Sequence, residues 1–233
     1  MARPPKAVIF DLDGTLFDHR RSATDAVTAW LPELGAVADD DLVARWFTLE
    51  DLHFVTWSTG GIDFAEQRRR RLSDFLPLIA VEPGTPEELD GLFADYLVHY
   101  QQAWTGFEDA EAGVAAVERA GLERAILTNG RVAMQNAKID AIGLAGRFGG
   151  VFTAEGLGSA KPEAAAYLTV CASIGVAPAE VLHIGDRYDL DVLAARAAGL
   201  AAVHLDRDDA GPHEEPHRLT SLTRLGDYLD AVG

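Results

Sequence analysis

Short apolar runs recur along the chain, and each ends in glycine or in polar residues. A continuous apolar run with β-branched residues predicts a strand that is buried on both faces, as in a parallel sheet covered by helices. Such runs occupy residues 7–10, 123–130, 149–156, 180–186 and 200–206. Ala-rich segments of helical character, often closed by glycine, accompany the later runs at residues 111–121, 133–144, 163–175 and 191–199. The alternation predicts an α/β fold with a doubly wound, mostly parallel, Rossmann-like sheet of at least five strands.

Residues 18–105 interrupt this alternation. The segment contains no run of the buried-strand kind, but it has amphipathic helical patterns at residues 22–35, 40–58, 63–80 and 85–104. It is far longer than a normal connection between two elements, so we expect it to fold on its own. We therefore predict an all-helical cap domain at residues 18–105, inserted into an α/β core domain that residues 1–17 and 106–233 form together.

The charge balance narrows the classes of partner. Lys and Arg number 20 and Asp and Glu 37, which gives a formal net charge of −17. A nucleic-acid or anionic membrane surface needs a basic footprint, so we expect neither partner. The single cysteine, Cys171, forbids an internal disulfide and fits a reducing compartment. Because no signal peptide and no apolar run of membrane-spanning length is found, we expect a cytoplasmic protein.

The first apolar run ends in two carboxylates one residue apart, Asp11 and Asp13. Side chains alternate along an extended chain, so both carboxylates can project to the same side, and Gly14 allows a sharp turn just beyond them. An ordinary turn also explains one Asp and one Gly. Two like charges this close repel each other, and a bound cation would make the pair tolerable.

Polar residues of similar kind follow the other predicted strands, where an open α/β sheet binds its ligands. They are Thr128-Asn129-Gly130, Lys161-Pro162, Gly185-Asp186 and, five residues further on, Asp191. Each group has an ordinary structural explanation as a turn, a helix start or a loop. Their joint occurrence at successive strand ends is what a purely structural interpretation does not predict.

Four separated motifs, in order, resemble those of the haloacid dehalogenase-like superfamily of hydrolases, in the subgroup with a helical cap after the first strand. The matching segments are "DLDGT" (11–15), "LTN" (127–129), "KP" (161–162) and "GDRYDLD" (185–191). The resemblance implies an enzyme that hydrolyses phosphate monoesters through an aspartyl-phosphate. Asp11 would be the nucleophile, and Asp13 would protonate the leaving oxygen and then activate water.

The resemblance also implies a Mg²⁺ cofactor and a set of groups around the phosphoryl oxygens. Asp11, the main-chain carbonyl of Asp13, and Asp186 would hold the metal. Lys161 would add positive charge, and Thr128 a hydroxyl donor. Backbone N–H groups around Leu12 and Asn129 would supply further donors, and Asp191 would order Lys161 or a metal-bound water from outside the ligand shell. Gly185 receives no metal role, although some relatives carry an acid at that position.

Several functions remain open on this basis. Family members that cleave carbon–halogen bonds lack the second motif-one Asp, so the presence of Asp13 favours phosphoryl transfer to dehalogenation. The preferred substrate class is a small phosphorylated metabolite. A sugar-phosphate mutase is the nearest enzymatic alternative, and a non-catalytic binding protein that keeps the fold is a more distant one. A monomer or a homodimer is compatible with the sequence.

The cap offers one candidate for substrate contact. Asp63 and Glu66 resemble a capping box, which predicts a helix from there to about Ile79. Helical geometry places Arg68 near the middle of the apolar stripe of this helix. Arg68 either packs there and pairs with an acidic neighbour, or it holds a charged part of the substrate. In the core, His183 is expected to be a buried structural histidine, and residues 206–220 an acidic loop in solvent.

Overall fold

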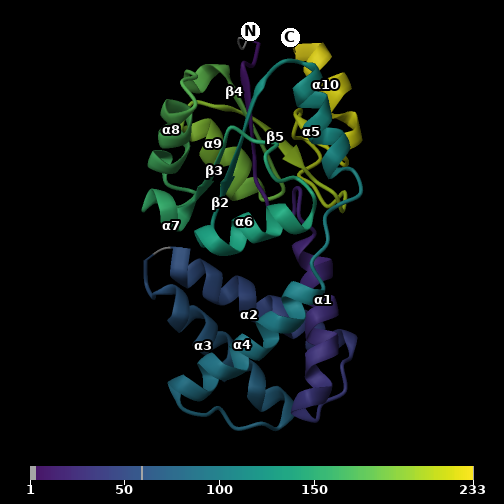
Figure 1. The fold of residues 1–233 in the computed structure, drawn as a ribbon, viewed down its shortest axis with the longest axis vertical. Helices are drawn as coiled ribbons and strands as arrows, with labels where there is room; N and C mark the ends of the chain where they lie inside the picture. Colours follow the sequence, from purple (N-terminus) through teal and green to yellow (C-terminus); the bar gives the residue numbers. More distant parts are fainter. Residues whose placement is uncertain (1–3, 59, 233) are drawn as a thin grey trace. The chain divides into compact units, whose positions relative to one another are not determined.

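A parallel sheet of six strands forms the centre of the core unit in the computed structural model, which describes residues 4–58 and 60–232 (Figure 1). The order across the sheet is β3-β2-β1-β4-β5-β6, and every pairing is parallel. The strands are β1 (Ala7–Phe10), β2 (Glu123–Thr128), β3 (Gly150–Thr153), β4 (Val181–Gly185), β5 (Ala201–Leu205) and β6 (Arg218–Leu219). The first five match the predicted runs, and the α/β fold class is confirmed.

Helices cover both faces of the sheet, which is why its central strands are apolar throughout. Alternate residues of β1, Ala7 and Ile9, pack with residues of α8 and α9 on one face, and α5 and α10 cover the other (Figure 1). All four residues of β1 are fully buried. The core helices are α5 (Ala110–Arg119), α6 (Val132–Ala141), α7 (Ala154–Leu157), α8 (Ala164–Ser173), α9 (Ala194–Ala197) and α10 (Leu225–Val232).

The chain divides into two compact units, Met1–Asp18 with Thr105–Gly233, and His19–Trp104. These limits differ by one residue from those that the sequence predicts. In the second unit the described residues form helices and connecting turns, without a strand. Its α-helices are α1 (His19–Trp30), α2 (Asp40–Ser58), α3 (Phe64–Phe75) and α4 (Pro86–Gln102).

The third helix of the cap is shorter than its sequence suggests. It begins where predicted, because Asp63 accepts a hydrogen bond from the Glu66 N–H at 2.7 Å. The prediction of a continuous helix to Ile79 is wrong, since α3 ends at Phe75 and a 3-10 turn, Leu76–Ile79, follows. Pro77 at the start of that turn lacks the N–H that a continuing α-helix would use.

The arginine that α3 buries is Arg71, which lies 3% exposed, whereas Arg68 is only half-buried. Arg71 Nη1 donates to Glu50 Oε1 of α2 at 2.9 Å, and its guanidinium carbon lies 3.9 Å from the centre of the Trp46 ring. The apolar stripe did not predict the burial of Arg71, because a buried arginine is tolerated only with a counter-ion, and this counter-ion comes from another helix. The guanidinium of Arg68 instead lies between the rings of Phe64 and Phe93, at 4.5 and 4.7 Å.

Residues 206–220 are only in part the solvated acidic loop that the sequence indicated, since Asp208, Asp209 and Glu214 are exposed but other acids are not. Two of their acids are buried and paired with arginines: Asp206 accepts from Arg218 Nε at 2.7 Å, and Glu215 accepts from Arg196 at 2.7 and 2.8 Å. Arg218 itself belongs to β6, which adds the sixth strand to the sheet. The acidic composition did not reveal that two of these acids are buried, because each buried charge is neutralised by a partner distant in sequence or on another element.

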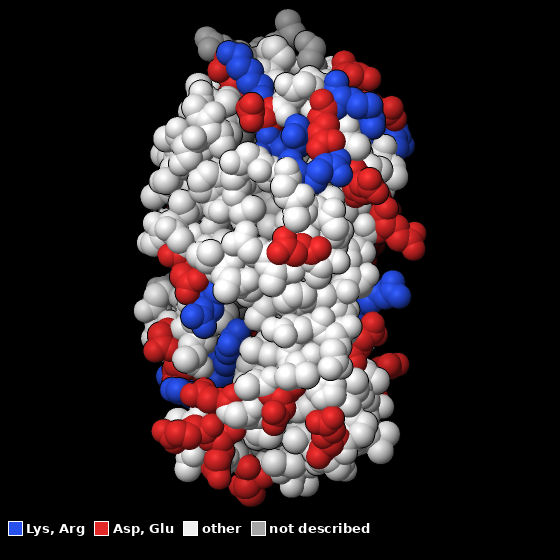
Figure 2. Space-filling view, viewed as in Figure 1, with Lys and Arg blue, Asp and Glu red and all other residues white. Residues whose placement is uncertain are grey.

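The surface in the view of Figure 2 shows no broad field of basic side chains, and its Lys and Arg residues lie among Asp and Glu. Ion pairs account for part of this pattern; Glu118, for example, accepts from Arg147 at 2.6 Å and lies 3.6 Å from Arg124. Among residues 4–58 and 60–232, no helix is both long enough and apolar enough to cross a membrane.

Candidate active site

The carboxyl ends of three neighbouring strands meet at one edge of the sheet. The register sets the last residue of β1 beside Ile126 of β2 and Ile184 of β4. Residues that end or follow these strands are therefore brought together although they are far apart in sequence. They are Asp11, Thr128 and Asp186, three of the residues that the sequence singled out.

Lys161 connects two of the carboxylates in this site. Its Nζ donates to Asp11 Oδ1 at 2.6 Å and to Asp191 Oδ1 at 2.5 Å. Lys161 and Asp191 are almost completely buried, and Asp11 is 6% exposed. Burial alone would favour a neutral lysine, but the two carboxylates outweigh it and raise the pKa of Lys161 above its usual range. Lys161 is therefore a fixed positive charge beside Asp11.

The backbone of Lys161 is held as firmly as its side chain. Asn129 Nδ2 donates to the Lys161 carbonyl at 2.7 Å, and the Lys161 N–H donates to Asn129 Oδ1 at 2.8 Å. This reciprocal pair joins the loop after β2 to the segment that precedes α8. The Asn129 side chain is thus occupied in positioning Lys161, while the predicted contribution of its backbone N–H to substrate binding stays a prediction.

Asp191 has polar partners on both carboxylate oxygens. Besides Lys161, its Oδ1 lies 3.0 Å from His183 Nε2, and its Oδ2 accepts from the Arg187 N–H at 3.0 Å. Burial would raise its pKa, but Lys161 and His183 oppose this and bring the pKa below its usual range. His183 is fully buried and packs edge to face against Tyr167, in agreement with the expected structural histidine.

The backbone that carries Asp191 departs from the predicted helix at 191–199. Residues Tyr188–Leu193 form a π-helical turn, and α9 begins only at Ala194. Such wide turns are common at functional sites and have no periodicity that a sequence pattern reveals. The turn folds Asp191 back over β4, where a Cβ on Gly185 would lie 2.2 Å from the Asp191 Cγ. Position 185 therefore has no room for the additional acid that some relatives carry.

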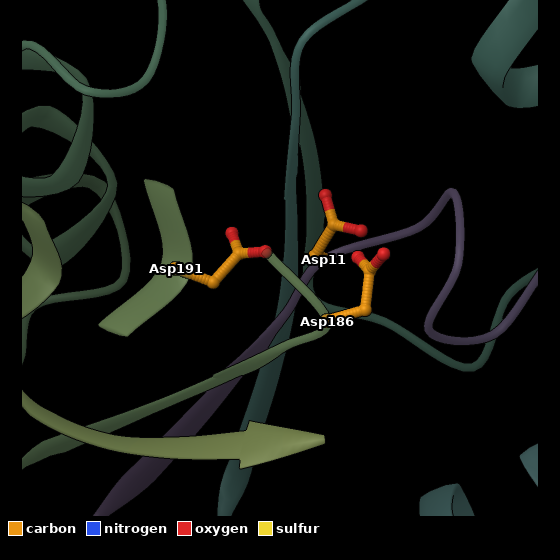
Figure 3. Close-up of side chains that lie close together, drawn as sticks. All are labelled: Asp11, Asp186 and Asp191. Atoms are coloured by element: carbon orange, nitrogen blue, oxygen red, sulfur yellow. The ribbon is translucent and has the colours of Figure 1, made fainter. Parts of the chain in front are cut away.

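Asp186 is the carboxylate whose oxygens the protein leaves least occupied. Its Oδ1 is buried and accepts no hydrogen bond among the described residues. Ligand oxygens of Asp11, Asp186 and Asp191 all lie within 4.8 Å of one another, and Figure 3 shows Asp11 and Asp186 side by side. Gly14 makes this possible, because its φ of +88° suits glycine and a Cβ there would lie 2.3 Å from Asp186 Oδ2.

The site carries an excess of negative charge. Burial raises the pKa of Asp11 to about 7; Lys161 opposes this shift, whereas Asp191 and Asp13 add to it. Burial and the charges of Asp11 and Asp191 also raise the pKa of Asp186 well above its usual range. Ionisation of all three carboxylates against one ammonium would leave two negative charges in a buried place, and a divalent cation would neutralise them.

Asp13 is held by two residues of α6 that the sequence analysis missed. Lys138 Nζ donates to Asp13 Oδ1 at 2.6 Å, and Gln135 Nε2 donates to Asp13 Oδ2 at 2.8 Å and to Thr128 Oγ1 at 2.6 Å. Two signals could have pointed to them. Gln135 and Lys138 are three residues apart and so share a helix face, and the chain has only three lysines, of which Lys138 and Lys161 are buried here.

An arginine holds the loop that follows Asp13. Arg207, just after β5, donates to the Gly14 and Thr15 carbonyls at 3.2 and 2.7 Å and lies 3.6 Å over the Phe107 ring. Asp109 accepts two further hydrogen bonds from the same guanidinium, at 2.9 and 3.1 Å. The turn that follows Asp11 and Asp13 is therefore bound to the residues after β5 and before α5.

Two predicted binding residues lie apart from these contacts. Leu12 is fully buried, and its carbonyl accepts the N–H groups of Thr15, Leu16 and Phe17, which closes the turn after β1. Arg68 belongs to the cap unit, where its guanidinium lies near the two aromatic rings named above and its charge helps to lower the pKa of Asp90. A role in substrate binding stays a prediction for both.

Several known proteins are similar to this chain in sequence or in fold. A phosphoserine phosphatase of Thermus thermophilus is 34% identical over 201 residues, which cover 86% of this chain and 76% of that protein. An (S)-2-haloacid dehalogenase of Xanthobacter autotrophicus is 30% identical over 206 residues, 87% of this chain and 75% of that one. The HAD-hydrolase YfnB from Bacillus subtilis has the same fold, with a TM-score of 0.85 at 20% identity over 98% of this chain and 100% of its own.

The sequence model of the haloacid dehalogenase-like hydrolases matches residues 5–199. The match spans β1, the helical insertion and the strands up to β4, with all four motifs in it. The chain therefore belongs to the haloacid dehalogenase-like hydrolase family.

Proposed function

We propose that this protein is a Mg²⁺-dependent phosphatase that hydrolyses the phosphate monoester of a small metabolite through an aspartyl-phosphate on Asp11. The observation that carries the proposal is the buried, unpartnered oxygen of Asp186 beside the Asp11 carboxylate. An acceptor oxygen without a hydrogen bond in such a place is costly unless a ligand occupies it. The phosphoserine phosphatase relative supports the ester class.

The donor set fits a hard divalent cation. Asp11 and Asp186 would hold it together with the main-chain carbonyl of Asp13, since Mg²⁺ prefers oxygen ligands. Asp191 lies within the same carboxylate cluster, but both of its oxygens already accept hydrogen bonds, so we assign it to the support of Lys161. When bound, the cation would neutralise the two excess charges and polarise a phosphoryl oxygen.

In the first step, a carboxylate oxygen of Asp11 attacks phosphorus in line with the leaving oxygen. The Lys161 ammonium, whose Nζ lies 2.6 Å from Asp11 Oδ1, compensates charge on the phosphoryl oxygens. The Thr128 hydroxyl donates a hydrogen bond to one of these oxygens. Asp13, which enters this step in its protonated form, gives its proton to the departing alkoxide as the P–O bond breaks. The products are the free alcohol and phospho-Asp11.

In the second step, Asp13 acts in the opposite direction. Now ionised, it takes a proton from a water molecule, whose oxygen attacks the phosphorus of phospho-Asp11. The acyl phosphate bond breaks, inorganic phosphate leaves and the Asp11 carboxylate is restored. One carboxyl group thus serves as acid and then as base, and the two steps together consume one water per ester.

A panel of phosphorylated metabolites, including phosphoserine and phosphoglycolate, tests the proposed function by the release of inorganic phosphate. We expect one phosphate per substrate consumed in the presence of Mg²⁺, no activity with excess EDTA, and recovery when Mg²⁺ is restored. Halide release from a 2-haloacid without divalent cation would instead indicate a dehalogenase, as in the Xanthobacter relative. Conversion of β-glucose 1-phosphate to glucose 6-phosphate without release of phosphate would indicate a mutase.

Arg68 extends the proposal to the cap. If its guanidinium holds a charged part of the substrate, Arg68→Ala should lower kcat/KM for the best metabolite by about 10-fold or more. The kcat/KM for 4-nitrophenyl phosphate should change little, because this ester has no second charged group for the cap to bind. Arg70→Ala is the matched control, since Arg70 lies on the same helix, half-exposed, and pairs with Glu66 at 2.8 Å. Equal losses for both esters would show that Arg68 has a structural role only.

A further inference from the structure

We propose that Gln135 is a positioning residue that sets the Asp13 carboxylate and the Thr128 hydroxyl at the same time, with Lys138 as its partner on α6; this inference rests on the proposed phosphatase function. No motif of the family resemblance includes either residue. Both side chains are buried, with Gln135 2% and Lys138 5% exposed. They are 122 and 125 residues from Asp13 in the sequence.

The chemistry of the contacts fixes the orientation of the Gln135 amide. Asp13 Oδ1 accepts from the Lys138 ammonium at 2.6 Å, the contact of an ionised carboxylate, and an ionised carboxylate oxygen only accepts hydrogen bonds. Until Asp13 takes up the proton for the first step, the amide atom that faces its Oδ2 at 2.8 Å is therefore the nitrogen, Nε2. This nitrogen has two hydrogens and no lone pair to offer. Its second hydrogen is donated to Thr128 Oγ1, at 2.6 Å.

The orientation of Thr128 follows from that of the amide. Because Thr128 Oγ1 accepts from Gln135, its own proton is directed away from Gln135. A hydroxyl constrained in this manner is ready to donate to a phosphoryl oxygen, without a search among rotamers at the moment of reaction. One side chain therefore connects the proposed acid and base with the proposed phosphoryl donor.

The Asp13 carboxylate is restrained on both of its oxygens. Lys138 Nζ holds Oδ1 and Gln135 Nε2 holds Oδ2, so rotation of the carboxylate breaks a hydrogen bond to a buried partner. The ammonium of Lys138 also lies 4.8 Å from the centre of the Phe17 ring, which limits its movement. A restrained carboxyl group loses less entropy when it transfers a proton to the leaving oxygen.

Gly130 supports this arrangement independently. A Cβ at position 130 would lie 2.7 Å from the Gln135 Cδ and 2.9 Å from its Nε2. No positive φ demands glycine there, so the space taken by the Gln135 amide is the reason that the structure gives for it. Gly130→Ala should therefore displace the amide while Gln135 itself remains.

The test compares kcat/KM for phenyl phosphate and 4-nitrophenyl phosphate, two esters of similar shape whose leaving groups differ in acidity. Phenol has a pKa of about 10, so its departure depends on a proton from Asp13 far more than that of the more acidic nitrophenol. In Gln135→Glu the nitrogen becomes an acceptor oxygen. We expect this variant to lose about 100-fold with phenyl phosphate and about 10-fold with the nitrophenyl ester.

Two further variants protect the test from a folding defect. Gly130→Ala should move the ratio of the two kcat/KM values in the same direction, because it disturbs the amide without a new charge. Asn136→Asp makes the amide-to-acid change one residue further along α6, where the side chain is exposed, and should leave the ratio unchanged. Thermal unfolding of each variant checks that the fold is retained.

Equal losses with the two esters, or wild-type ratios in both Gln135→Glu and Gly130→Ala, would overturn the inference about Gln135 while leaving the phosphatase function in place. A wild-type protein that releases no phosphate from either ester in Mg²⁺ would remove the proposed function, and this inference with it.

Discussion

Replacement of Asp11 by asparagine should reduce phosphatase turnover by more than about 1,000-fold. The amide has nearly the same shape as the carboxylate, but it cannot attack phosphorus to form the acyl phosphate. The measurement is phosphate release at saturating substrate with Mg²⁺, and mass spectrometry of quenched wild-type protein should detect a phosphorylated Asp11 that the variant lacks.

The fold should survive this substitution. Asp11→Asn removes one of three clustered carboxylates, two of which bind the Lys161 ammonium, so it lowers the repulsion in the site as well as one attraction. We expect a thermal midpoint no lower than that of the wild type in the absence of divalent cations. A folded variant that retains a tenth of the wild-type activity would exclude Asp11 as the nucleophile.

Replacement of Lys161 by methionine should affect both stability and catalysis. The substitution leaves Asp11 and the completely buried Asp191 without their shared cation, and loss of one partner from a buried ion pair costs about 3–5 kcal/mol. Activity should fall by about 100-fold or more, because a donor that compensates charge on the transferring phosphoryl group is lost. Urea unfolding and phosphate release give the two measurements.

Lys6→Met is the matched control for this variant. Lys6 pairs with Glu180 at 3.0 Å, but its side chain is 66% exposed, so the same substitution should leave stability and activity close to those of the wild type. Addition of Mg²⁺ should recover part of the stability of Lys161→Met by binding to the native state. A Lys161→Met protein with unaltered unfolding and turnover would contradict the role given to this lysine.

In the helical cap, hydrophobic periodicity was sufficient to predict the helices but not the partners of their buried charges. Local signals predicted its helices, and the start of α3 at Asp63 depends on a contact within one turn. The burial of Arg71 was not predicted, because it depends on Glu50 from α2. A hydrophobic pattern shows which residues are apolar, but it does not show which charged side chain will form an ion pair with a residue of another helix.

The same distinction applies to the active site. The sequence predicted Asp11, Asp186 and Lys161 because each comes after an apolar strand. Parallel strands end at the same edge of a sheet, so residues that follow them were expected to lie close together. Gln135 was missed, because its function depends on a hydrogen bond to a residue 122 positions away.

Local hydrophobicity and motifs of adjacent residues were enough to predict the alternation of strands and helices, the inserted cap and the carboxylates at the strand ends. The folded chain was needed to reveal the partners of the buried charges: Lys138 with Asp13, Arg196 with Glu215 and Arg218 with Asp206. It also decided the sixth strand and the π-helical turn that places Asp191 over Gly185. These features depend on groups that only the folded chain brings within hydrogen-bond distance, and a buried charge is stable only when such a partner is present.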